Sequence, residues 1–337
     1  MPILYGSTAR SLLSTALSAG ALLLVTACSG LMPSNAIPAV SAPNGGSTRA
    51  ANILPNAAPA KTLQFETLDD QADPTFNQLL GINDRGKIAG YFGSGAAGHP
   101  NQGYTLAKPY GQADYTNENF PGSVQTQVTA INDRGDTAGF WVDAKGVNRG
   151  FVEWKGVFTS YSDPRTHGGT VNQILGLNGA GIAVGFYADA AGVNHGFTLN
   201  QATGRFSPVS PPGGVSVVAT GINASGDVVG FVTTTSGTTT GFLRQGHHFS
   251  AFSFPGGSNT QPFGVNENDQ IVGSYVDTAG TMHGFLLSHP LSHAKWTSID
   301  DPNGIGSTVI NGLNNSGDMV GFYTDAAGNT DGMLIQP

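Results

Sequence analysis

The chain has 337 residues, of which 39% are hydrophobic and 11% are charged, and its formal net charge at pH 7 is −8. The hydrophobic share is enough for a buried core, and the 49 glycines indicate a turn-rich globular protein. Only 14 residues are Lys or Arg, and they are scattered along the chain, so the sequence offers no basic surface for nucleic acid.

The first 27 residues have the pattern of a signal peptide. Arg10 precedes an uncharged, mostly apolar run over residues 11–27, which is too short for a comfortable membrane span but suits a signal-peptide core. The run ends in Val25-Thr26-Ala27-Cys28, which resembles a bacterial lipobox; a signal peptide with an incidental cysteine is the alternative. The resemblance implies cleavage before Cys28, a lipid on its thiol and a membrane anchor. Ser29 in place of Asp resembles the pattern sorted to the outer membrane.

Cys28 is the single cysteine, which excludes an internal disulfide framework and any cysteine-based metal cluster. Residues 28–60 follow with several prolines among Ala, Ser, Asn and Gly, almost no charge and no apolar period. We interpret this segment as a disordered tether between the lipid and the domain that follows.

Residues 61–337 contain six copies of one repeat of about 45 residues. Each copy has an apolar residue followed by Asn and a turn, then an apolar pair closed by Gly, and then a Gly-Phe pair or a variant of it. An aromatic strand running toward proline completes most copies. The repeated asparagines are Asn83, Asn132, Asn178, Asn223, Asn266 and Asn314.

Each repeat contains four short apolar or aromatic runs separated by Asn, Asp, Gly and Pro turns, without helical periodicity. This pattern predicts an all-β fold, a six-bladed β-propeller with four strands in each blade. The fourth strand type first appears near Phe65, before any first strand, whereas the last repeat lacks it. We therefore predict that residues 62–68 supply the outer strand of the last blade and close the ring.

These motifs resemble the HAF-repeat family of bacterial extracellular repeat proteins over nearly all of the chain after residue 62. His195-Gly196-Phe197 and His283-Gly284-Phe285 stand where that family has His-Ala-Phe. The resemblance implies export and repetition, and it carries over no catalytic residue and no reaction.

Acidic residues fall in the loops that we expect at one end of the ring. Asp143, Asp189, Asp277 and Asp325 lie in the predicted loops between second and third strands, where they are weak candidates for a calcium site. Tight turns require the same residues, and turn formation is the simpler explanation. The repeated asparagines could line the central channel, but we predict that each one caps its own turn. The repeat otherwise indicates no cofactor.

Asp163, Arg165 and His167 depart from the repeat and have side chains of the types that enzymes use in catalysis, although a solvated loop explains them as well. We predict a surface or periplasmic binding module, tethered to the membrane by lipid, for a glycan, a peptide or a protein partner. The alternative is a polysaccharide hydrolase or lyase in which those three residues converge near the axis with Asp300 or Asp301. A purely structural envelope protein would have no pocket of ligand size.

Overall fold

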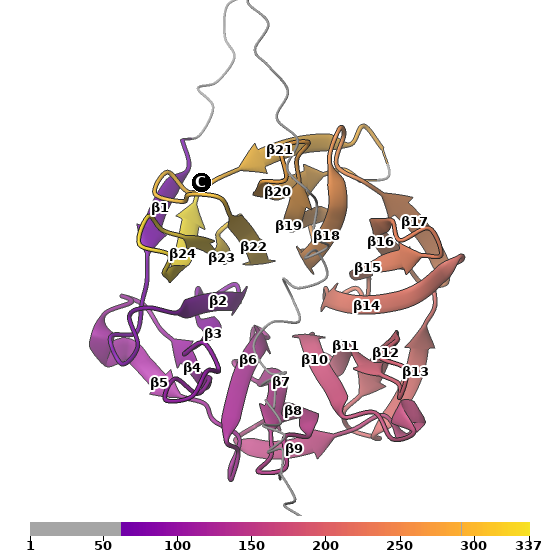
Figure 1. Cartoon of the computed structure of the whole chain (residues 1–337), viewed down its shortest axis with the longest axis horizontal. Helices are drawn as coiled ribbons and strands as arrows, with labels where there is room; N and C mark the ends of the chain where they lie inside the picture. The colour runs from indigo at the N-terminus through magenta and orange to yellow at the C-terminus, as the bar shows by residue number, and fades with distance from the viewer. Residues whose placement is uncertain (1–61, 291) are drawn as a thin grey trace, which may run out of the picture.

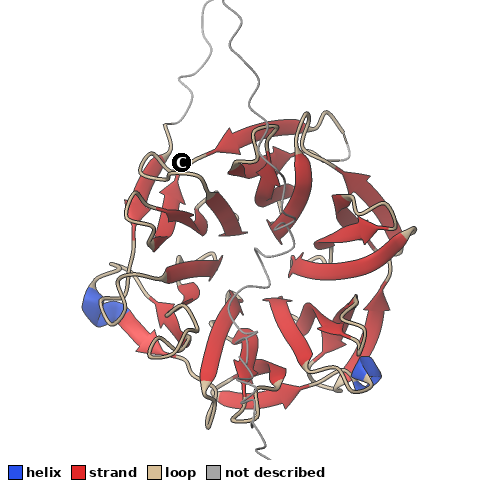
Figure 2. Cartoon of the chain, in the orientation of Figure 1, coloured by secondary structure: helices blue, strands red, loops and turns tan. Residues whose placement is uncertain are grey.

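The computed structural model describes residues 62–290 and 292–337. The predicted signal peptide, the Cys28 lipidation site and the whole tether, residues 28–60, therefore lie outside the described residues. The described part contains six four-stranded antiparallel sheets arranged as blades around a central axis (Figure 1). It has two short 3-10 helices, η2 (Gln112–Asp114) and η3 (Pro164–Thr166), and is otherwise strand and loop (Figure 2). No helix in these residues is long and apolar enough to cross a membrane.

The blades follow one another along the chain, and each begins with the strand nearest the axis. Blade 1 consists of β2 (Asn77–Ile82), β3 (Ile88–Phe92), β4 (Gln102–Leu106) and β5 (Tyr115–Asn117). Blade 2 consists of β6 (Gln125–Ile131), β7 (Thr137–Val142), β8 (Asn148–Trp154) and β9 (Val157–Tyr161). Blade 3 consists of β10 (Val171–Leu177), β11 (Ile182–Ala188), β12 (Asn194–Asn200) and β13 (Arg205–Val209).

Blade 4 consists of β14 (Gly214–Ile222), β15 (Val228–Thr234), β16 (Thr239–Gln245) and β17 (His248–Phe252). Blade 5 consists of β18 (Ser258–Val265), β19 (Gln270–Val276), β20 (Met282–Ser288) and β21 (Lys295–Ile299). Blade 6 consists of β22 (Thr308–Leu313), β23 (Met319–Thr324), β24 (Thr330–Gln336) and β1 (Gln64–Thr67).

The predicted ring closure is confirmed. Strand β1, from the start of the described chain, pairs antiparallel with the C-terminal strand β24, with Phe65 opposite Ile335. The Leu68 amide extends this pairing by donating to the Gly332 carbonyl at 2.9 Å. Leu68 is buried in a cluster with residues of blades 1 and 6, so the closing segment also contributes to the core. The two ends of the chain thus complete one sheet and leave no open blade.

The hydrophobic core lies between neighbouring blades. One cluster combines Val152 of blade 2 with Ile174 and Phe197 of blade 3, and similar clusters join other neighbouring blades. The inner strands are buried along most of their length, whereas outer strands such as β9 are mostly exposed. A single blade could not cover both of its faces, so the repeats depend on one another for burial.

The repeated glycine of the second strand is required by close packing against the first strand. Each pairing of these two strands contains a register shift, in blade 3 between Ile174 and Gly176. A Cβ atom on Gly185 would lie 1.9 Å from the Gln173 carbonyl oxygen, and the same contact recurs in every blade. The equivalent glycines are Gly90, Gly139, Gly230, Gly273 and Gly321. This agrees with the bulge and close approach that glycine usually marks in a strand.

Candidate functional site

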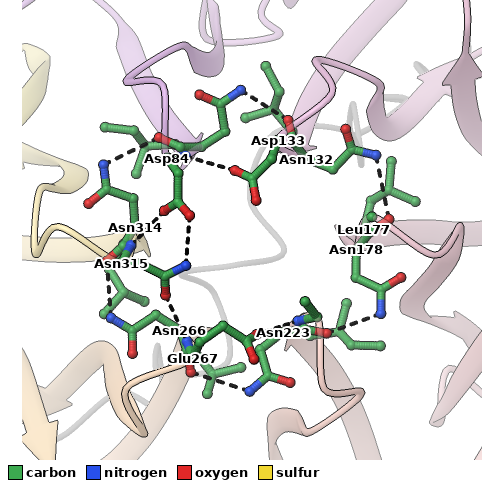
Figure 3. Close-up of a pocket in the computed structure, with 18 residues that line it drawn as sticks. Asp84, Asn132, Asp133, Leu177, Asn178, Asn223, Asn266, Glu267, Asn314 and Asn315 are labelled. Atoms are coloured by element: carbon green, nitrogen blue, oxygen red, sulfur yellow. Dashed lines mark hydrogen bonds between the residues drawn. The ribbon is translucent and has the colours of Figure 1, made fainter.

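The repeated asparagines form a hydrogen-bonded belt around the axis (Figure 3). In blade 3, Asn178 Oδ1 accepts the amides of Ala180 and Ile182, both at 3.0 Å, which is the geometry of a turn cap. Its Nδ2 group donates to the Asn223 carbonyl of blade 4 at 3.1 Å. All six asparagines repeat this inter-blade bond, at 3.0–3.5 Å, and the Asn314 side chain closes the belt on the Asn83 carbonyl.

The residues that follow the asparagines add polar side chains beside the belt on four blades, namely Asp84, Asp133, Glu267 and Asn315. The Asp84 amide donates to Asp133 Oδ1 at 2.8 Å, and the Asn315 amide donates to Asp84 Oδ1 at 2.8 Å. The hollow that these residues surround has a volume of only about 100 Å³. Deeper along the axis, a space of about 20 Å³ remains between side chains that include Leu80, Leu175 and Phe263. Neither space approaches the size of an ordinary small-ligand pocket.

The four acids considered for calcium each hold a turn on a different blade. Asp189 Oδ1 accepts the amides of Ala191 and Val193 at 2.9 and 3.0 Å, and Asp143, Asp277 and Asp325 repeat this pair of bonds. Their second oxygen contacts a side chain of the same blade, namely Arg149, His195, His283 or Asn329. Within residues 62–290 and 292–337, no three His, Cys, Asp or Glu side chains are grouped to hold a metal ion.

The structure brings Asp163 and Arg165 together at the connection between blades 2 and 3. Asp163 is buried and caps η3, with its Oδ1 accepting the Arg165 amide and Arg165 Nε, both at 2.9 Å. Arg165 Nη2 also contacts Asp163 Oδ2, and this hydrogen bonding raises the pKa of the arginine. His167 ends η3 in the left-handed backbone region and is exposed.

Asp300 and Asp301 do not join this group. They follow β21 in the connection between blades 5 and 6, three blades around the ring from Asp163. Asp301 is buried, and Asp300 contacts His283. The acid and base that the enzyme hypothesis brings together near the axis are therefore separated in the structure.

A pocket of about 320 Å³ lies between blades 3 and 4, beside Arg165. The Arg165 guanidinium stands over one face of the Tyr187 ring, 5.6 Å from its centroid, and His195 stacks on Tyr187 at a centroid distance of 4.9 Å. His195 Nε2 lies 2.9 Å from Asp189 Oδ2, and this contact is the main reason that the pKa of Asp189 is lowered.

Another wall of the pocket comes from β13, β14 and the connection between them. Pro208, Pro211 and Val215 supply apolar surface, and Ser210 adds a hydroxyl group. Val215 is among the few large hydrophobic side chains that are exposed, with 47% of its surface accessible. The pocket therefore combines a cation, an imidazole and apolar walls, a mixture that suits the binding of a small polar molecule with a carbon ring.

Sequence reasoning found some of these residues and missed others. Arg165 stood out as a departure from the repeat, and His195 as part of a His-Gly-Phe sequence, but nothing in the sequence joined them. Both side chains contact the ring of Tyr187 and line the same pocket, which the proline-rich connection after β13 helps to form. The two consecutive prolines after Ser210 were the available signal, because the corresponding connections that contain proline have a single one, preceded by Asp or Phe, as in Asp163-Pro164 and Phe254-Pro255.

No protein-family model matches the sequence, and no curated protein matches it either. Solved structures do match. A TolB from Agrobacterium tumefaciens is similar over 82% of this chain and 98% of its own, with a TM-score of 0.55 and 9% identity. TolB from Acinetobacter baumannii is similar over 74% of this chain and 63% of its own, with a TM-score of 0.51 and 9% identity. At these identities, the likeness establishes the β-propeller fold and nothing finer.

Proposed function

We propose that this protein is an exported, lipid-anchored binding module whose propeller holds a glycan in the pocket between blades 3 and 4. The observation that carries this proposal is the pocket itself, where Arg165 and His195 flank Tyr187 and face apolar walls. Its volume of about 320 Å³ is at the lower end of small-ligand pockets, whereas the axial hollows are smaller.

The cellular address in this proposal comes from the sequence. The apolar run before Cys28 and the small residues beside it support export and lipidation, with sorting to the outer membrane. The six repeats and the two His-Gly-Phe sequences support membership of the HAF-repeat family. A lipid anchor followed by a proline-containing tether would place the propeller at the cell envelope, where polysaccharides are available as ligands.

The positions of the candidate side chains and the presence of the pocket favour binding over catalysis and over a purely structural role. A hydrolase or lyase needs an acid and a base at one substrate, but Asp163 is occupied by Arg165, and Asp300 lies across the ring. A structural protein without a ligand would need no pocket of this size between two blades.

The experiment is a thermal-shift screen of the purified protein against envelope and extracellular glycans and divalent cations. A ligand of the native state raises the melting temperature by mass action. We expect a shift with one class of glycan, lost in Arg165→Ala and retained in Arg205→Ala, an exposed arginine of β13 that does not line the pocket. A shift that survives Arg165→Ala would contradict the proposed location. Stabilisation by calcium alone would contradict the glycan proposal.

A further inference from the structure

The repeat allows one blade to be used as a reference for another. Strand β12 pairs with β13 in the same register as β20 pairs with β21. His195 of blade 3 therefore corresponds to His283 of blade 5, and Ser210, which follows β13, corresponds to Asp300, which follows β21. The two histidines also share their environment on one side, because each stacks on a tyrosine of the neighbouring strand.

In blade 5, the imidazole of His283 lies between two carboxylates. Its Nε2 is 3.3 Å from Asp277 Oδ2, and its Nδ1 is 2.8 Å from Asp300 Oδ1. A carboxylate can only accept, so donation from both ring nitrogens requires the imidazolium form. Burial lowers the pKa of His283, but its hydrogen bonds with Asp300 and Asp277 outweigh burial and raise it.

In blade 3, only half of this arrangement is present. His195 Nε2 contacts Asp189 as His283 contacts Asp277, but the shorter serine at position 210 makes no hydrogen bond to Nδ1. Nδ1 has no partner within residues 62–290 and 292–337, and His195 lines the open pocket. Arg165 lines the same pocket; its Nε and Nη2 groups bind Asp163, whereas Nη1 has no partner in the described part of the chain.

We propose that the pocket between blades 3 and 4 binds the carboxylate of an acidic sugar in the position that Asp300 occupies in blade 5. The ligand carboxylate accepts a hydrogen bond from His195 Nδ1, and Arg165 Nη1 supplies a donor for another oxygen of the same ligand. The sugar ring contacts the apolar wall of Pro208, Pro211 and Val215. This inference rests on the proposed glycan-binding function and specifies its ligand class.

Donation to a ligand carboxylate requires a proton on Nδ1 as well as the proton that Nε2 donates to Asp189. The bound ligand would therefore complete around His195 the two-carboxylate arrangement that His283 has in blade 5. The titratable or charged groups around His195 are Asp189, Tyr187 and, beyond Tyr187, the Arg165–Asp163 pair. The pocket wall from β13, β14 and their connection contains no titratable group.

The test is isothermal titration calorimetry of the full chain with glucuronate and galacturonate, and with glucose and galactose as their neutral counterparts. We expect a uronate to bind at least about tenfold more tightly than its neutral counterpart, because the neutral sugar has no carboxylate for His195 Nδ1. Acetate at the same ionic strength serves as the control for a simple anion.

Two variants separate the site from the fold. Ser210→Asp recreates the blade 5 arrangement and should weaken uronate binding at least about tenfold without loss of the melting temperature. His195→Gln places at this position the residue that blade 1 has at Gln102, and it should weaken uronate binding, because a neutral amide is a weaker partner for a carboxylate than an imidazolium. Asp227→Asn, in a turn of blade 4 outside the pocket, is the control and should bind normally.

The possible results separate this inference from the proposed function. If a uronate binds and Ser210→Asp abolishes this binding, the carboxylate assignment and the proposed glycan-binding function are both supported. Equal affinity for the neutral sugar, or binding unaffected by Ser210→Asp, overturns the carboxylate assignment but leaves a glycan module possible through the screen described above. Equal competition by acetate overturns the sugar assignment. No heat with either uronate overturns the inference, and the proposed function fails with it only if the glycan screen also gives no shift that depends on Arg165.

Discussion

Replacing one asparagine of the axial belt should measure how strongly neighbouring blades are held together. Asn178 is buried and makes three hydrogen bonds, two to its own turn and one to blade 4. In Asn178→Ala, two amides and one carbonyl lose this partner at a net cost of about 1 kcal/mol each. We therefore expect the free energy of unfolding to fall by about 3 kcal/mol and the melting temperature by about 6 °C.

Asn178→Asp separates the contribution of the turn cap from that of the bond to blade 4. The aspartate keeps the oxygen that caps the turn, but it places a carboxylate oxygen where the amide donated to the Asn223 carbonyl at 3.1 Å. At neutral pH, this buried acceptor faces another acceptor, so the variant should be clearly destabilised. A protonated carboxyl can donate to the carbonyl again, so the deficit should shrink as the pH falls from about 7 to about 4.

Urea denaturation followed by circular dichroism at several pH values is the assay. Asn200→Ala is the matched control, because Asn200 lies in the same blade and makes one local bond, to the Thr203 amide. It should cost no more than about 1 kcal/mol. An Asn178→Asp protein that is as stable as the wild type at neutral pH would refute the inter-blade contribution of the belt.

Three further predictions concern the closure and packing of the ring. Deletion of residues 62–68 exposes the edge of the last blade and should cause a large loss of thermal stability, and an unchanged melting temperature would contradict the closure. Gly185→Ala should lower the free energy of unfolding by about 3 kcal/mol, as overpacking does, because the new Cβ atom meets the Gln173 carbonyl. Gly179→Ala is the control and should be tolerated, because its Cβ atom would meet nothing within 4 Å; equal urea midpoints for the two variants would contradict this reasoning. Burial is the main reason that the pKa of Asp69 is raised to about 6, so stability is lost as the pH rises through that value. Above pH 7, the free energy of unfolding of Asp69→Asn should therefore exceed that of the wild type by about 1 kcal/mol after solvent screening, and this advantage should disappear near pH 4. Equal melting curves of the two proteins at both pH values would be the opposing result.

The sequence predicted the fold well because the fold is repetitive. Six copies of one pattern reported the strand order six times, and the unmatched strand near Phe65 indicated how the ring closes. The turn-cap role expected of the asparagines matches the bonds that Asn178 makes within its own turn. Their bonds between blades were not foreseen, because the distance from Asn178 to Asn223 depends on the curvature of the closed ring.

The candidate site was less predictable because it joins three separate segments of the chain. Arg165 precedes blade 3, His195 is the second residue of its third strand, and Pro211 follows its fourth strand. Each position varies among the repeats, and variation alone cannot show which side chains meet. Asp163 illustrates the difficulty, since its sequence context suggested an acid or base, whereas the structure uses its carboxylate to hold Arg165 and η3.

Hydrogen–deuterium exchange with a ligand from the glycan screen would test the central claim most directly. If the pocket between blades 3 and 4 is the binding site, protection should concentrate in residues 163–167, 187–196 and 208–217, which contain the side chains that surround it. Protection centred instead on the axial turns that contain Asn83 and Asn223 would place the ligand at the mouth of the ring and contradict the account.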